Sequence, residues 1–109
     1  MSGRGVSTGT ISATGITTLP QPMGDRVSSY TVHFESVSFS GSVTIKGATP
    51  GQGHTALGVA YKNMQTGLNA TAAITGNALV LVDAAGIELT LDATVTSGSL
   101  KWAATPMMG

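Results

Sequence analysis

The sequence of 109 residues has no cysteine, and both its aromatic and its charged residues are scarce. Without cysteine, a disulfide, a thiolate metal site and a thiol nucleophile are all excluded. Charged residues make up 9% of the chain, against about 25% in an average soluble domain. Five cationic side chains are balanced by five carboxylates, which leaves no basic field for a nucleic acid or an anionic membrane surface. We therefore expect neither a nucleic acid nor a membrane as a partner.

Long apolar runs are missing as well. The longest, residues 78–82, ends at Asp83 and is far shorter than the ~20 residues of a membrane-spanning helix. The first residues lack the apolar stretch of a secretory signal, so we do not expect the protein to be exported by a signal. The length suits one small domain, and the scarcity of aromatic residues means that its core must be aliphatic.

What is present is a repeated alternation of apolar and polar residues from Val27 onwards. This period of two is typical of β-strands with one buried face, and turn residues separate the segments every ~8–12 positions. We predict an all-β domain over residues 25–109, either an antiparallel β-sandwich or a barrel-like, jelly-roll-like arrangement. A change of parity predicts a bulge near residues 35–36, with a further bend or turn at Gly41. Residues 62–77 fit a strand or a short helical turn, and we favour a strand because threonine and asparagine disfavour helices.

Two apolar segments, residues 78–82 and 87–95, are separated by residues 83–86 with the sequence DAAG. Aspartate at the start and glycine at the end predict a type I turn in which Gly86 takes the left-handed conformation. The strands on either side of this turn are then expected to pair directly as a hairpin. A second cluster of turn residues, 96–99, is expected to separate the last two strands.

Residues 1–24 consist mostly of glycine, serine, threonine and proline, with isolated apolar residues. Ordering each residue costs roughly 1–2 kcal/mol of backbone entropy, which so few apolar side chains cannot offset. We therefore predict an extended N-terminal arm that binds an adjacent chain. Ile11, Ile16 and Leu19 are its expected apolar anchors.

Short motifs with a catalytic or cofactor-binding pattern occur without the context that they need. Residues 5–9 (GVSTG) fit a nucleophile elbow but lie in the arm, rather than between a strand and a helix. Residues 51–56 (GQGHTA) resemble a dinucleotide fingerprint, yet they open an alternating segment instead of a helix. Glu88 and Asp92 share a strand face about 13 Å apart at ~3.3 Å per residue, beyond the ~5–9.5 Å of glycosidase carboxylates. We predict no catalytic residue, no cofactor and no enzymatic activity.

His33 and Glu35 share one strand face and have the spacing of a two-ligand metal site on a surface. No further ligand has a suitable spacing, so we favour a solvated polar face and predict no metal. Tyr30, Tyr61 and Trp102 have the chemistry of a sugar-binding platform. Each is in phase with aliphatic neighbours two positions away, however, and we favour a place in the core or in an interface.

Both faces of residues 78–82 are apolar, whereas a sandwich strand normally buries one face. The second face must be covered by the arm or by another subunit, and the lack of net charge favours association. We therefore expect Leu79 or Val80, whichever faces outward, to lie in an interface, with Trp102 as a further candidate.

Residues 78–89 (ALVLVDAAGIEL), 95–100 (VTSGSL) and the tail 106–109 (PMMG) resemble the closing hairpins of small β-sandwich virion proteins of tailed bacteriophages. The glycine- and threonine-rich entry segment is similar in style. The resemblance implies a structural head decoration (cement) protein, which binds the major capsid protein or another virion protein on the capsid surface and has no catalytic residues. It also implies a homo-oligomer, typically a trimer, that is made in the host cytoplasm. The alternative function is a carbohydrate-binding or adhesion module associated with a fibre or the tail.

Overall fold

The computed structural model of the chain describes residues 6–19, 27–51 and 53–108. These residues form eight β-strands in one antiparallel sheet that does not close, and they contain no helix, which confirms the predicted all-β antiparallel fold. The strands are β1 (Ser7–Ile11), β2 (Gly15–Thr18), β3 (Val27–Ala48), β4 (Leu57–Gly58), β5 (Tyr61–Asn63), β6 (Leu68–Ala70), β7 (Ala78–Asp83) and β8 (Glu88–Met108).

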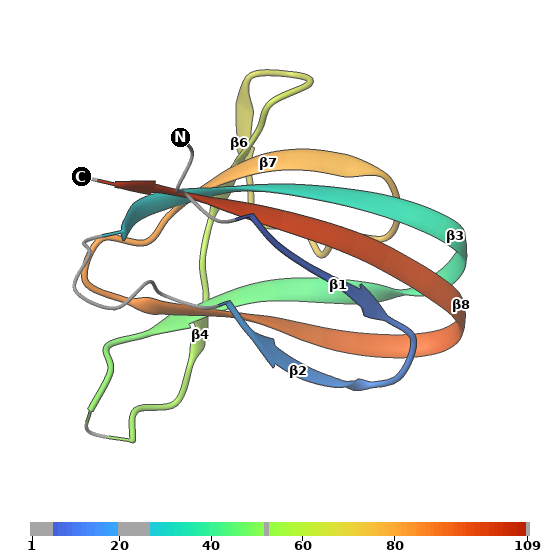
Figure 1. Ribbon diagram of the computed structural model, residues 1–109, viewed down its shortest axis with the longest axis horizontal. Coiled ribbons are helices and arrows are strands. Elements are labelled where there is room, and N and C mark those ends of the chain that lie inside the picture. The colour runs from blue at the N-terminus through green and yellow to red at the C-terminus, as the bar shows by residue number, and fades with distance from the viewer. Residues whose placement is uncertain (1–5, 20–26, 52, 109) are drawn as a thin grey trace.

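Two long strands, β3 and β8, form the centre of the sheet and pair along almost their whole length. A straight strand of 22 residues would be about 70 Å long at ~3.3 Å per residue, but the longest dimension of the molecule is 37 Å. Both strands therefore fold over near their middle, so that each contributes to two layers (Figure 1).

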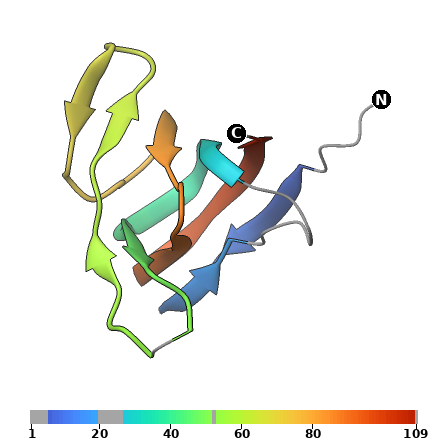
Figure 2. The same cartoon turned by 90° about the vertical axis from the view of Figure 1, so that its left-hand side faces the viewer.

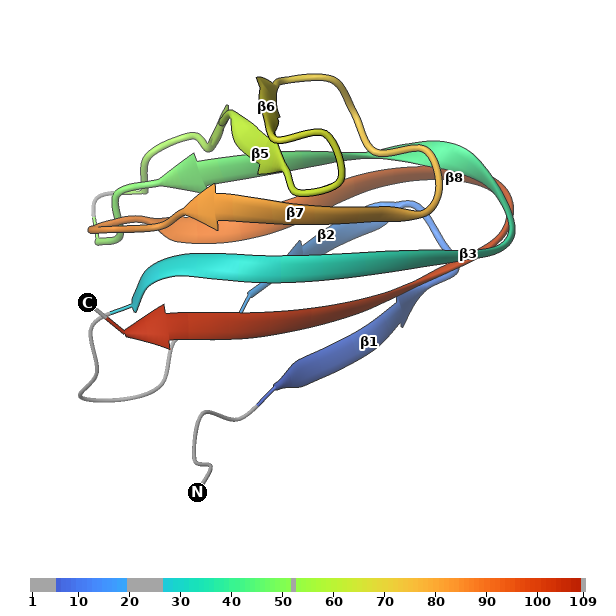
Figure 3. The ribbon, with the colours of Figure 1, turned by 90° about the horizontal axis from the view of Figure 1, so that it is seen from above.

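The two layers are two halves of one folded sheet (Figure 3). The first half of β3 and the second half of β8 form the first layer, together with β7 and β1. The remaining halves form the second layer with β2 and β4, while β5 and β6 extend the sheet beyond β7. The arrangement is sandwich-like, and the fold-over of β3 and β8 connects its two layers.

Three residues at the fold-over have a positive φ angle: Ser38 at 53°, Gly41 at 152° and Gly98 at 71°. The Cβ atom of any other residue at position 98 would overlap the backbone carbonyl of Ser38. Glycine at position 98 thus serves both the backbone conformation and the close approach of the two strands.

Two predictions about the region of the fold-over are wrong. The register of β3 against β8 shifts between Val37 and Gly41, so the irregularity lies later than the predicted bulge at residues 35–36. Residues 96–99 are part of β8 and not a turn between two strands. Glycine and serine allow a sharp bend as well as a turn, and the pairing of β3 with β8 on both sides makes it a bend.

The core lies between the two layers and is mainly aliphatic, as the composition predicts. Val32 and Phe34 point inward from the first layer, and Val43 and Ile45 from the second. The irregularity at the fold-over explains why even positions are buried before it and odd positions after it. Among the described residues, no polar or charged residue is buried. The largest fully buried side chains are Tyr30, Phe34, Leu19, Leu89, Leu91, Leu100, Val32, Val43, Val80 and Val82.

The prediction of an N-terminal arm on an adjacent chain is wrong for the strands β1 and β2. Both pair antiparallel with β8 of their own chain, and Ile11 and Leu19 are buried in the shared core. Backbone hydrogen bonds along an existing strand order a segment that has too few apolar side chains to order itself. The rest of the predicted arm, residues 1–5 and 20–24, lies outside the described residues.

The predicted hairpin between residues 78–82 and 87–91 is also wrong, although its glycine is placed correctly. Gly86 has a φ of 77°, in the left-handed region. The N–H of Ile87 donates to the carbonyl of Ala84 at 3.2 Å, which closes a turn with glycine at the third position, as in type II turns. This turn crosses between the layers, because β7 pairs with β3 and β5, whereas β8 continues into the second layer.

Residues 62–77 contain a small hairpin of β5 and β6, which confirms the preference for strand over helix at residues 68–70. Its loop begins at Asn63, whose Oδ1 accepts the N–H groups of Gln65 at 2.9 Å and Thr66 at 3.3 Å. The hairpin projects from the rest of the sheet (Figure 1).

Candidate functional site

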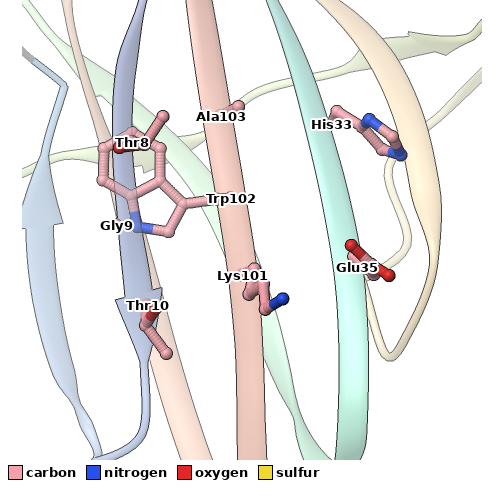
Figure 4. Close-up of a pocket in the computed structure, with 8 residues that line it drawn as sticks. All are labelled: Thr8, Gly9, Thr10, His33, Glu35, Lys101, Trp102 and Ala103. Atoms are coloured by element: carbon pink, nitrogen blue, oxygen red, sulfur yellow. The ribbon is translucent and has the colours of Figure 1, made fainter.

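The outer face of the first layer carries a shallow hollow of about 350 Å³ over β1, β8 and the first half of β3 (Figure 4). The residues that line it are Thr8, Gly9, Thr10, His33, Glu35, Lys101, Trp102 and Ala103. These strands are adjacent in the sheet, so their outward residues form rows across it.

One row contains both charges of the hollow. Thr10 lies opposite Lys101, and Lys101 lies opposite Glu35. Both charged side chains are exposed, and they do not form an ion pair. Within the part of the chain that the structure describes, the ion pair is that of Lys46 with Asp92, at 2.9 Å on the second layer.

A neighbouring row contains Thr8, Ala103 and His33. His33 and Glu35 are on one face, as predicted, and both are exposed. The described residues contain no group of three or more histidine, aspartate or glutamate side chains that could hold a metal ion. Lys101, opposite Glu35, adds a positive charge that would repel a cation. These side chains suit a neutral polar contact better than a metal ion.

The three candidate aromatic residues do not form an exposed platform. Tyr30, Tyr61 and Trp102 are 1%, 8% and 7% exposed, which confirms that they belong to the core. The hydroxyl of Tyr61 donates to the carbonyl of Ala72 at 2.9 Å. Trp102 covers Gly9, where an added Cβ atom would lie 2.7 Å from the indole Nε1.

Burial also acts on the phenol of Tyr30. Removal from water raises the pKa of Tyr30 above its ordinary value of 10.0, and the carboxylate of Glu88 raises it further. Tyr30 is a core residue that lies between Val82 of β7 and Pro106 of β8, and this shift reflects its packing.

The six residues proposed as interface anchors do not form one surface. Four of them, Ile11, Leu19, Val80 and Trp102, are buried within the chain itself. Ile16 is 69% exposed on β2, and Leu79 is half-buried on the outer face of β7. Of the alternatives at β7, Leu79 is therefore the residue that faces outward.

Several exposed apolar residues were not singled out by the sequence pattern. Leu57 and Leu68 are 71% and 69% exposed, and Met64 in the β5–β6 hairpin is 46% exposed. Met64 and Leu68 are isolated apolar residues in the polar segment KNMQTGLNA, which is a signal in the sequence, whereas Leu57 lies in the alternating segment TALGVAY, which gives no such signal. Such residues are spread over different ends of the molecule and do not form one patch around the hollow.

No protein-family model, curated protein or solved structure matches the chain. The described residues include no helix of the length and apolarity needed to cross a membrane.

Proposed function

We propose that the protein is a structural subunit of a virion, a decoration (cement) protein that binds and stabilises the head surface of a tailed bacteriophage. The observation that carries the proposal is the outer face of the first layer, a broad sheet surface on which hydroxyl, small and half-buried apolar side chains lie beside the exposed His33, Glu35 and Lys101. Leu79 and Leu81 lie there beside Thr31 and His33 of the neighbouring strand. A surface of this kind suits contact with other protein chains over a wide area.

The low charge of the chain supports attachment through apolar burial and backbone hydrogen bonds rather than through charge. Its cationic and acidic residues balance, and the ion pair of Lys46 with Asp92 already neutralises one of each. Salt screens charges over about 8–10 Å, so an attachment that depended on charge would weaken steeply as salt is added. The proposed attachment should keep its strength as salt is added.

The alternative of a carbohydrate-binding module has less support. Sugar binding usually relies on aromatic rings that are open to the ligand. Tyr61 and Trp102, the rings expected to stack on a sugar, are 8% and 7% exposed. A glycan array with the purified chain is the direct check of this alternative, and we expect no binding on it.

The proposal is tested on particles purified from the source that encodes the chain. We expect the protein in the particle fraction and its density on the head surface in a cryo-electron microscopy map. Its occupancy should stay constant from low to molar salt and fall in urea. Absence from the particles, or release by moderate salt alone, contradicts the proposal.

A pair of variants addresses the surface that makes the attachment. Leu79→Asp places a charge on the outer face of the first layer and should lower occupancy on the particle. Leu57→Asp, a matched change of an exposed leucine outside that face, should leave occupancy unchanged. Urea unfolding of both variants separates loss of binding from loss of folding, because Leu79 is half-buried.

A further inference from the structure

The direction of the backbone hydrogen bonds in the first layer can be followed from strand to strand. The N–H of Met64 donates to the carbonyl of Leu79 at 2.9 Å, so odd-numbered residues of β7 face β5. Residues alternate in direction along an antiparallel strand, so even-numbered residues of β7 face β3. The hydrogen bond from the N–H of Ala84 to the carbonyl of Ser28, at 2.9 Å, agrees with this assignment.

The same alternation continues to the edge of the layer. Even-numbered residues of β7 lie opposite even-numbered residues of β3, so the backbone groups of the even-numbered residues of β3 face β7. The odd-numbered residues of β3, which include those opposite Lys101 and Ala103, therefore face β8. Even-numbered residues of β8 then face β1, where Trp102 lies opposite Gly9. The backbone N–H and C=O groups of Thr8 and Thr10 therefore point away from the sheet.

The strand β1 is the end of the strand order, and no described residue pairs with its outer side (Figure 2). Edge strands are commonly protected from pairing by charged residues, proline, bulges or short length. The five residues of β1 (STGTI) include no charge and no proline, and their register with β8 is unbroken. The other edges are shorter: β6, at the opposite end of the strand order, has three residues, and β2, at the edge of the second layer, has four.

We infer that β1 pairs antiparallel with β1 of a second copy of this chain, around a two-fold axis at Gly9. In this register Thr8 lies opposite the partner's Thr10, and Thr10 opposite the partner's Thr8. Each of these two pairs exchanges both of its backbone hydrogen bonds, because the groups involved point outward in both copies. The first layers of the two copies then form one continuous sheet.

The arrangement of charge across the two-fold axis suits a second copy as the occupant. Lys101 lies in the same row as Thr10, and across the axis this row continues to the partner's Thr8 and the partner's Ala103. Each lysine therefore faces a small neutral residue and not the partner's lysine. Because β1 itself carries no charge, no like charges lie opposite each other at the axis.

The two-fold contact is independent of the proposed function, and it differs from the trimer that the phage resemblance implies. Its test needs the purified full chain and no particles, so each proposal can fail without the other. Sedimentation equilibrium of the wild-type chain should give twice its mass of 10.9 kDa. A monomer at all concentrations up to about 1 mM, or a trimer, would overturn the inference.

Proline substitutions identify the edge that makes the contact. Thr10→Pro removes an N–H that points outward, and proline is tolerated on edge strands in that orientation. We expect the Kd of the dimer to rise by about tenfold to hundredfold, since one donor is lost from each copy. Thr18→Pro is the matched control at β2, because the N–H of Leu19 donates to the carbonyl of Leu89 and that of Thr18 points outward.

The control should dimerise like the wild type. A dimer that withstands Thr10→Pro, or one that Thr18→Pro weakens equally, contradicts pairing through β1. Unfolding in urea checks that both variants are folded.

Paired charges test the register. In the double variant Thr8→Asp with Thr10→Asp, every cross-axis pair joins two carboxylates, and dimerisation should be lost. In Thr8→Lys with Thr10→Asp, every pair joins a lysine to an aspartate, and the dimer should persist. Equal behaviour of the two double variants would exclude the register centred on Gly9.

Discussion

Gly98 lies directly against the backbone carbonyl of Ser38, at the point where β3 and β8 fold over together. Both residues have a positive φ angle, 71° for Gly98 and 53° for Ser38. Only the residue without a side chain allows the strands to approach this closely. The two layers, and hence the outer face and the edge on which both proposals depend, follow from this contact.

Replacement of Gly98 by alanine should therefore be strongly destabilising. The left-handed conformation costs roughly 1–2 kcal/mol for an L-residue, and overlap with the Ser38 carbonyl adds about 1–3 kcal/mol. Urea unfolding measures the loss. The matched control is Gly76→Ala, since a Cβ atom there meets no neighbour and the φ angle is not positive. A Gly98→Ala variant as stable as the control would show that the backbone can rearrange at the fold-over.

The variant Gly86→Ala separates the cost of the left-handed backbone conformation from the cost of steric overlap. Gly86 has a φ of 77°, but an added Cβ atom would meet nothing within 4 Å. We expect a loss of about 1–2 kcal/mol from the backbone conformation alone, clearly smaller than at Gly98. Urea unfolding of the two variants side by side provides the comparison, and equal losses would contradict the steric overlap at Gly98.

The sequence could predict those features of the fold that depend on residues close to one another in the chain. The alternation around Val32 and Phe34 predicts a half-buried strand, and the change of parity before Val43 predicts an irregularity. The DAAG segment predicts glycine at positive φ. Each of these signals acts over a few residues, where local sterics and burial decide the conformation.

The pairing partners could not be predicted in the same way. A turn at Gly86 has the same local chemistry whether it joins paired strands or crosses between two layers. The choice depends on the fold-over at Gly98, which is distant in sequence. For the same reason, the sequence could not decide between Leu79 and Val80 as the residue on the outer surface. Both are apolar, and only the pairing of β7 with β3 decides which one faces outward.

The N-terminal segment gives a further prediction. Deleting residues 1–20 removes β1 and β2 together with the buried side chains of Ile11 and Leu19, each worth about 1.5–3 kcal/mol when fully buried. We expect a large loss of stability in urea unfolding or failure to fold. Deleting residues 1–5, which precede β1, is the control. An intact domain after the longer deletion would show that these strands contribute little to the core.

The last prediction concerns pH. Burial and the carboxylate of Glu88 raise the pKa of Tyr30 above 10.0 in the folded chain, whereas an unfolded tyrosine ionises near its ordinary value. The unfolded chain therefore releases this proton first as the pH rises, and the folded chain retains it. Since stability falls wherever the folded state binds more protons, the free energy of unfolding should decrease above about pH 10 and be unaffected by this group near neutrality.

Tyr30→Phe keeps the ring in the core but removes the titrating hydroxyl. All other ionisable groups are the same in both proteins, so their effect cancels in the comparison. We expect the free energy of unfolding of the wild type to fall more steeply with rising pH than that of Tyr30→Phe over about pH 9–11. Urea unfolding across this range measures both slopes, and the phenolate absorbance of the folded wild type should rise late for one tyrosine. Parallel slopes would mean that the hydroxyl of Tyr30 reaches water in the folded chain, in conflict with its 1% exposure.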